Sequence, residues 1–171
     1  EPSMMEISSQ ASFSDAHEIT CIPIIAANLH RVIRPEQSQI WAVLRKEDSM
    51  KRLQYSLVNT LLGRMCISGD IYELSDEQWA CIEEGMEFYR KAAPIIKDGK
   101  TTLISCDTES YLNPVGEQLV IRQLGTKYLA VAHRFANSKE VETEFLDGAT
   151  VLATFGDLSG EFCAKAWVYE K

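Results

Sequence analysis

Asp15 is the residue whose surroundings in the sequence best suit acid–base chemistry. It lies in the string Ser-Phe-Ser-Asp-Ala-His-Glu over 12–18, between an apolar stretch over 4–10 and an amphipathic stretch over 17–33. These stretches predict a buried strand and a helix. Carboxylates at the exit of a strand that feeds a helix are often catalytic in α/β folds. The position also suits a helix N-cap, and spacing alone favours the cap.

Further polar side chains follow the same kind of strand exit. His17 and Glu18 come directly after Asp15, where they would line a sugar pocket or stand solvated in a first helical turn. Arg45 and Lys46 end an apolar stretch over 39–44, where they would lie at the functional face and bind substrate or stand solvated at a strand exit. Asp70 ends the next one, over 64–68, where it would bind a ligand hydroxyl or cap its own loop.

Two residues with ring side chains in the predicted strands, Trp41 and His133, are interpreted as structural. Trp41 is interpreted as a core residue, although aromatic rings at strand ends also serve as sugar platforms. His133 lies on an alternating strand and is interpreted as structural. The spacing of His, Cys and Asp resembles no metal site, and the chain has neither a nucleophile elbow nor a glycine-rich phosphate loop. We therefore expect no metal and no cofactor.

The first 98 residues predict three strand–loop–helix units. The strands are expected over 4–10, 39–44 and 64–68. The first helix is expected over 17–33, with an irregular first turn or a late start because of Pro23. The second is expected from Asp48 or Ser49 to about 62, and the third from Asp76 to about 93, ending before Pro94. Ser75 and Gln78 form a capping box for the third helix. Such alternation predicts parallel pairing with helices covering the sheet.

The pattern changes to short strands and turns in the second part of the chain. We place the boundary at 96–101, where Lys-Asp-Gly-Lys over 97–100 is expected to form a polar hinge, so that 1–98 and 99–171 form two domains. The expected strands lie over 101–106, 117–123, 128–134, 141–145, 150–154 and 162–169. Their regular spacing predicts an antiparallel β-sandwich. The predicted fold class is therefore α/β followed by all-β.

Charge and cysteine usage narrow the partners and the compartment. The net charge of −8 argues against a nucleic acid or an anionic membrane as partner. The five cysteines are scattered and form no CxxC pair, which fits reduced thiols and a cytoplasmic location. No signal peptide or long apolar run is evident. The chain opens with Glu-Pro and not Met, from which we expect a piece of a longer protein.

The order of these elements and strings resembles the C-terminal part of an α-galactosidase of glycoside hydrolase family 36, in the clan shared with family 27. The resemblance rests on the Ser-Asp pair at 14–15, on Ser-Gly-Asp-Ile-Tyr-Glu-Leu-Ser over 68–75, and on Phe-Tyr-Arg-Lys over 88–91. It covers essentially the whole chain. It implies the last three units of a (β/α)8 catalytic barrel over 1–98, followed by the C-terminal β-sandwich.

The resemblance also implies an activity and a role for Asp15. Family members cleave terminal α-galactosides with retention, using an aspartate nucleophile on the fourth barrel strand and an aspartate acid/base on the sixth. Asp15 matches the acid/base, and the nucleophile would lie before residue 1. The implied ligand is an α-galactoside or a related oligosaccharide, and the 171-residue chain alone is expected to be inactive, because retaining hydrolysis needs both carboxyl groups.

Two further expectations follow. Strands cut from a barrel expose their edges and the side chains of their inward faces. We expect these exposed side chains to include Ile7, Ile40, Ala42 and Ile67. We therefore expect the chain to self-associate through these surfaces. The alternative function is a non-catalytic carbohydrate-binding or interaction module, with 99–171 as the working part. Exposed aromatic side chains on one face of the sheet would favour that alternative.

Overall fold

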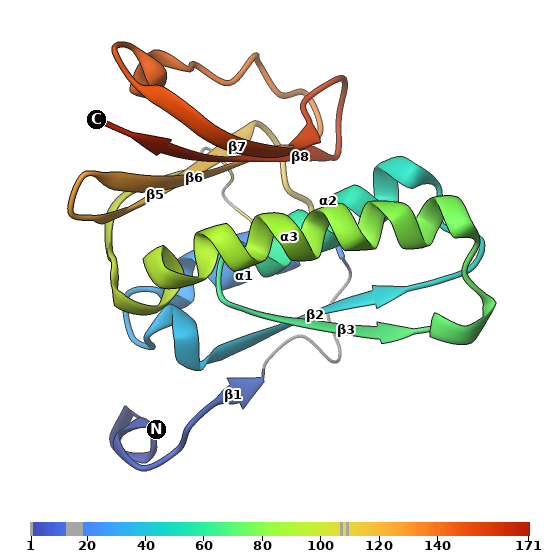
Figure 1. Ribbon diagram of the computed structural model, residues 1–171, viewed down its shortest axis with the longest axis horizontal. Coiled ribbons are helices and arrows are strands. Elements are labelled where there is room, and N and C mark those ends of the chain that lie inside the picture. Colours follow the sequence, from blue (N-terminus) through green and yellow to red (C-terminus); the bar gives the residue numbers. More distant parts are fainter. Residues whose placement is uncertain (1, 13–18, 107, 109) are drawn as a thin grey trace.

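The computed structural model describes residues 2–12, 19–106, 108 and 110–171. A parallel sheet in the order β1-β2-β3 consists of β1 (Ala11–Ser12), β2 (Ser38–Leu44) and β3 (Arg64–Gly69). The helices are α1 (Ile22–Leu29), α2 (Met50–Thr60) and α3 (Asp76–Asp98). An antiparallel sheet in the order β4-β5-β6-β8-β7 consists of β4 (Lys100–Cys106), β5 (Glu117–Leu124), β6 (Lys127–Arg134), β7 (Thr150–Asp157) and β8 (Cys163–Glu170). The helices lie between the two sheets (Figure 1).

Short 3-10 helices complete the described elements. They are η1 (Pro2–Glu6), η2 (Pro35–Gln37), η3 (Ile71–Glu73) and η4 (Glu144–Leu146). No helix among the described residues is both long and apolar enough to span a bilayer. The five cysteines are free thiols.

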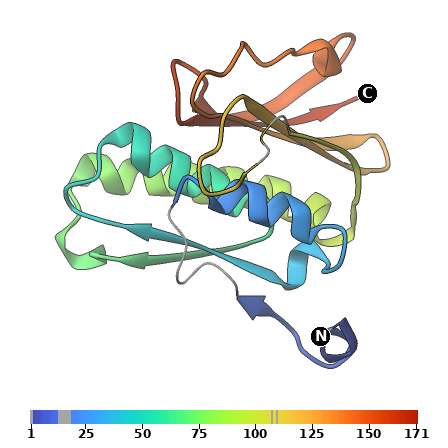
Figure 2. The same ribbon diagram turned by 180° about the vertical axis from the view of Figure 1, so that it is seen from behind.

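The parallel part has the predicted alternation of strands and helices. β2 pairs with β3 in parallel register, from Gln39 opposite Arg64 to Leu44 opposite Gly69. Ser49 is the N-cap of α2, because its Oγ accepts a hydrogen bond from the backbone N–H of Arg52. α1 begins only after Cys21, and this confirms the late helix start expected from a proline in its first turn. α1 and α2 cover the same face of the parallel sheet (Figure 2).

The alternation along β2 decides which side of the sheet carries the core. Ile40, Ala42 and Leu44 are fully buried on the side that faces the helices. The expectation that Ile40 and Ala42 lose their packing partners is therefore wrong, because α1 and α2 supply them. Ile67 also packs against this core, whereas Ile7 is 91% exposed.

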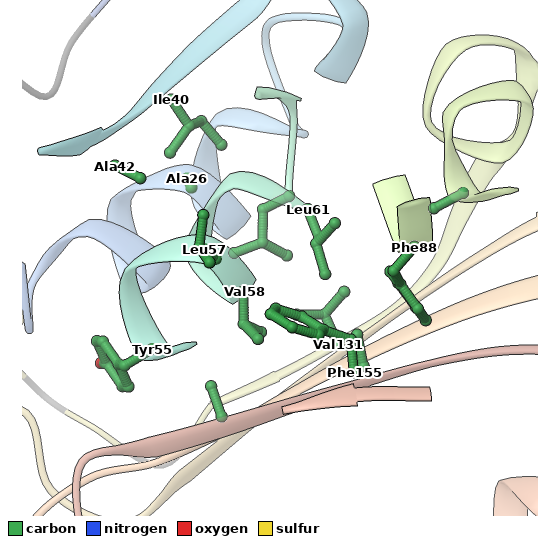
Figure 3. Packing of buried hydrophobic residues seen from close by; sticks show 14 of the residues in the cluster. Ala26, Ile40, Ala42, Tyr55, Leu57, Val58, Leu61, Phe88, Val131 and Phe155 are labelled. Carbon is green, nitrogen blue, oxygen red and sulfur yellow. The ribbon is translucent and has the colours of Figure 1, made fainter. Parts of the chain in front are cut away.

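Helix α2 is at the centre of the molecule. Leu57, Val58 and Leu61 lie between Ile40 and Ala42 on one side and Val131 and Phe155 on the other (Figure 3). One hydrophobic cluster therefore extends from the parallel sheet through the helices to the antiparallel sheet. The two halves of the chain share a core, although the sequence predicts a polar hinge between them at 97–100.

The strand predicted over 4–10 is wrong. This stretch contains η1, and parallel pairing begins only at Ala11, which lies opposite Ser38. The amide nitrogen of Gln37 donates to the carbonyl oxygens of Met5 and Ser8, both at 2.9 Å, and holds the segment by its backbone. Met4 is 58% exposed, so the apolar run reflects no buried strand.

The third helix does not end before Pro94. It continues for another turn to Asp98, with Pro94 inside it. The reason is Arg122, a buried residue of β5 that donates to the carbonyl oxygens of Ile95, Ile96 and Gly99. The carbonyls at the end of a helix lack partners within the helix, so these hydrogen bonds stabilise the turn that follows Pro94 from outside.

The predicted two-sheet sandwich is also wrong, because the described residues after 99 form one five-stranded sheet. No strand occurs over 141–145, where η4 begins at Glu144. The ring of Phe145 instead packs on Trp167 and Tyr169, with centroids 5.4 Å and 5.7 Å apart. One face of the sheet is therefore covered by this segment and the other by the helices (Figure 1).

A buried network joins the helix ends to the second sheet. Arg122 Nη1 donates to Thr101 Oγ1 at 2.6 Å, and His30 Nδ1 lies 3.1 Å from that hydroxyl. His30 Nε2 lies 2.6 Å from the carbonyl oxygen of Leu62, which only accepts, so Nε2 carries the proton. Burial, with a further contribution from Arg122, lowers the pKa of His30 to about 4 despite the bond to Leu62.

His133 is structural, as predicted. Its ring is fully buried, its Nε2 lies 2.9 Å from Asn59 Oδ1 on α2, and its edge meets the ring of Tyr55. Burial lowers the pKa of His133 to about 3. Both described internal imidazoles, His30 and His133, are therefore neutral in the folded chain at neutral pH.

We expect the free energy of unfolding to decrease as the pH is lowered from 6.5 toward about 4. In that window the unfolded chain binds protons on both imidazoles and the folded chain does not, so acid favours unfolding; above 6.5 the contribution is complete. Urea unfolding across this range measures it. His30→Gln keeps a donor for Leu62 but does not titrate, so this variant should lose less stability; an identical loss would contradict the assignment.

Self-association through the edges of the parallel sheet stays a prediction. β1 is two residues long and β3 has no neighbour on its outer side among the described residues. Edge strands offer unpaired backbone groups to other chains. We expect light scattering to give a mass above 19.3 kDa at high protein concentration, decreasing on dilution. A constant monomer mass would rule the association out.

Candidate functional site

The carboxyl ends of the three parallel strands meet at one edge of the sheet. β1 ends at Ser12, β2 at Leu44 and β3 at Gly69. Asp15 and His17 follow the end of β1 in the sequence but lie outside the described residues, as does Glu18. Their predicted roles stay predictions. The structure describes the edge of the sheet at which β1 ends, and these residues follow β1 in the sequence.

Arg45 and Asp70, predicted from separate strand exits, are in contact. Arg45 Nη1 lies 3.2 Å from Asp70 Oδ1, and the side chains are 50% and 26% exposed. The backbone N–H of Asp70 donates to the carbonyl of Leu44 at 2.9 Å, which fixes this carboxylate beside the end of β2. The structure therefore brings together Arg45 and Asp70, two of the six polar residues that the sequence places at strand exits.

Gly69 makes this close approach possible. Its φ is +109°, and a Cβ at this position would lie 1.9 Å from the carbonyl oxygen of Leu44. Only glycine leaves room for the chain of β3 to turn against the end of β2. The Ser-Gly-Asp string of the sequence thus has a geometric reason, because the glycine places the aspartate.

Two other carboxylates at this edge, not singled out as site residues from the sequence, complete the arrangement. Glu73 forms an ion pair with Lys46. Asp48 accepts from the backbone N–H of Arg45 at 2.8 Å and from Arg52 Nε at 2.7 Å, and its side chain is 4% exposed. Asp48 therefore shapes the turn after β2, while Ser49 caps the helix. The charged run over 45–48 was the available signal, although it does not show which charges turn inward.

Gln78 ties this turn to the next helix. Its side chain completes the predicted capping box with Ser75, and its amide nitrogen also faces the carbonyls of Arg45, Lys46 and Asp48 at 3.1–3.4 Å. The residue is 5% exposed. The start of α3 therefore holds the turn that carries Arg45, which the capping-box pattern alone did not predict.

The face of the parallel sheet that is turned away from the helices carries hydrogen-bonding side chains beside the exposed Val43. Trp41 Nε1 donates to Ser12 Oγ at 2.9 Å, and Gln39 Nε2 donates to Cys66 Sγ at 3.3 Å. Trp41 is partly exposed and lies outside the core, which corrects its interpretation as a core residue. In a (β/α)8 barrel the face of the strands opposite the helices lines the interior. Among the described residues no cluster of three side chains could hold a metal ion.

No protein-family model matches the sequence, and no curated protein matches it significantly. Solved structures do match. The galactosidase domain of AgaSK, an alpha-galactosidase–sucrose kinase, gives a TM-score of 0.69 at 13% identity and covers 98% of this chain. The family 36 α-galactosidase AgaA from Geobacillus stearothermophilus gives 0.63 at 15% identity over 92%, and a substituted form of it in complex with raffinose gives 0.62 at 13% over 92%.

The resemblance inferred from the sequence motifs is thus confirmed as a structural match over most of the chain. At these identities the likeness concerns the fold. The chain spans about a quarter of the matched chains, 26% of AgaSK and 25% of AgaA.

Replacing Gln78 with Met should loosen the turn after β2. The variant keeps the volume of the side chain but removes the donor shared by three carbonyls and the oxygen that accepts from the backbone N–H of Ser75, so we expect a loss of about 1–3 kcal/mol in the free energy of unfolding. Amide hydrogen exchange over 45–48 should accelerate. Glu77→Met, at an exposed position in the same helical turn, is the matched control. Unchanged exchange in Gln78→Met would show that the turn is held by other contacts.

Proposed function

We propose that the chain is the acid/base-bearing part of a retaining α-galactosidase. The observation that supports this most is the match in fold to family 36 α-galactosidases over 98% and 92% of the chain, with Asp15 three residues beyond the end of the first parallel strand. A catalytic group at the carboxyl end of a barrel strand is the arrangement such folds use.

The chemistry assigns Asp15 two proton transfers. In a retaining enzyme the two carboxyl groups stand about 5–5.5 Å apart on either side of the anomeric carbon. One attacks that carbon; the other protonates the departing glycosidic oxygen and then accepts a proton from the water that releases the sugar. Asp15 is the second group in this proposal, and the nucleophile comes from a strand that these 171 residues do not include.

The neighbouring polar groups have binding roles in the proposal. Asp70, held by Arg45 beside the strand ends, accepts a hydrogen bond from a sugar hydroxyl, and His17 lines the pocket next to Asp15. The substrate class is a terminal α-galactoside. The matched AgaA structures contain raffinose, stachyose and 1-deoxygalactonojirimycin, which supports a galactose-related ligand for the fold.

The alternative function, a carbohydrate-binding module built on the antiparallel sheet, lacks the feature it needs. The aromatic rings of Phe135, Phe155, Trp167 and Tyr169 are at most 6% exposed. Tyr111, at 42%, lies outside the strands. Among the described residues of the antiparallel strands, Tyr128 is the one partly exposed aromatic side chain, and its ring stacks on the buried ring of Tyr169 with the centroids 5.0 Å apart. One such ring is not a face of exposed aromatic side chains, and we favour the barrel-part proposal.

The decisive experiment expresses the complete reading frame that encodes the chain. With a nitrophenyl α-galactoside, Asp15→Asn should reduce kcat by about 10²–10⁴-fold. This leaving group needs little protonation, so the glycosyl-enzyme should accumulate, and added azide should restore turnover and give the α-configured galactosyl azide. Asp70→Asn should mainly raise KM.

The 171-residue chain itself should show no turnover above background, because one carboxyl group cannot complete the double displacement. Hydrolysis by this chain that disappears in Asp15→Asn would overturn the assignment of the nucleophile. Full activity of Asp15→Asn in the complete reading frame, with no azide effect, would overturn the role of Asp15.

A further inference from the structure

A groove on the outer face of the antiparallel sheet lies apart from the strand ends described above. It has a volume of about 440 Å³ and runs between β4 and β5 on one side and residues 139–145 on the other. Leu103 of β4 lies opposite Ile121 of β5, and Ser105 lies opposite Leu119, so these residues share one face. The groove exists because residues 141–149 cover the part of the sheet formed by β6 and β8 and stop short of β4.

The floor of the groove is apolar. Leu103 is 40% exposed, which is high for a leucine in a sheet, and Leu119 beside it is partly buried. Phe145 closes the far side, where it packs on Trp167. An occupant must therefore bring apolar side chains to the floor if it is to remove this surface from water.

The rim of the groove is acidic. Val141 and Phe145 pack inward on the sheet, and the glutamates at alternating positions, Glu140, Glu142 and Glu144, are exposed and line the groove. Glu117 adds a fourth carboxylate, which accepts from the backbone N–H of Lys139 at 3.1 Å. Lys139 is the one cation among the lining residues, so the groove has a strongly negative potential.

We propose that this groove binds a cationic, amphipathic peptide segment of a partner protein, with alternate side chains on Leu103 and Leu119 and lysine or arginine side chains against the glutamate rim. Charge complementarity selects this occupant. A second copy of the chain, with a net charge of −8, does not bring the excess of positive charge that this acidic rim favours. β4 is an edge strand of its sheet among the described residues, so the groove over β4 and β5 lies beside a sheet edge.

The proposal is independent of Asp15 and of the glycosidase assignment. The groove lies on the sheet face turned away from the helices, whereas the strand ends of the parallel sheet lie beyond the helical layer. A loss of catalytic function would therefore leave the groove intact, and a loss of peptide binding would leave the catalytic proposal untouched.

The test uses the full 171-residue chain and a fluorescein-labelled eight-residue peptide that alternates lysine with valine. Fluorescence anisotropy at low salt should give saturable binding. Replacing Glu140, Glu142 and Glu144 together with Gln should weaken the binding by about ten-fold, the sum expected for three exposed ion pairs. Leu103→Ser should weaken it as well. Urea unfolding checks that each variant is folded.

Two matched controls separate the groove from general attraction to an acidic protein. Glu83, Glu84 and Glu87 are exposed on α3, and their triple Gln variant has the same net charge as the groove variant but should bind the peptide as the parent does. A peptide that alternates lysine with serine tests the apolar floor and should bind at least several-fold more weakly. Equal weakening in both triple variants, equal binding of both peptides, or saturation of the groove by raffinose instead would overturn the proposal.

Discussion

The structure depends on the burial of helix α2 from Tyr55 onward, between the two sheets. Its residues from Tyr55 to Thr60 are all buried, because the parallel sheet lies against one face and the antiparallel sheet against the other. A helix in this position needs apolar side chains all round and internal partners for every polar one. Leu57 and Val58 meet the first condition. Asn59 meets the second, since its amide donates to the carbonyl of Ile19 and its oxygen lies 2.9 Å from His133 Nε2.

This constraint turns two apparent domains into one folding unit. Removing residues 99–171 would expose the outer face of α2 and leave Asn59 without His133. It would also remove Arg122, which closes the last turn of α3. The polar residues at the predicted boundary therefore mark a tight connection from α3 to β4 through Gly99, and they do not mark a hinge. The antiparallel sheet stabilises the helices that hold the parallel strands in place.

The elements that the sequence predicts well are those whose partners are local. Ser49 and Ser75 cap helices through hydrogen bonds within three residues, and both starts are confirmed. The predictions that are wrong concern segments whose stabilising hydrogen bonds come from residues distant in the sequence. Pro94 ends a helix by local rules, but Arg122, 28 positions later, sustains it. The apolar run over 4–10 predicts a strand, but its backbone is held by Gln37 instead.

The predicted sandwich failed for a related reason. The nearly continuous burial of β6 and β8 shows that both faces of the sheet are covered, but the apolar runs in the sequence do not show by what. The helices cover one face, and a segment with no strand covers the other through Phe145. Similarly, alternation in β2 identifies two faces without saying which one meets the helices, so Ile40 and Trp41 were assigned to the wrong sides.

The strand ends show how a polar site is positioned without depending on its own charges. Arg45 and Asp70 are half and a quarter exposed, and an ion pair of this kind contributes at most about 1 kcal/mol to stability. Their positions are fixed instead by backbone contacts, the N–H of Asp70 on Leu44 and the amide of Gln78 on the turn after β2. A ligand can therefore exchange the ion pair for its own hydroxyl groups at little cost to the fold, because the geometry around it is maintained by groups that the ligand does not touch.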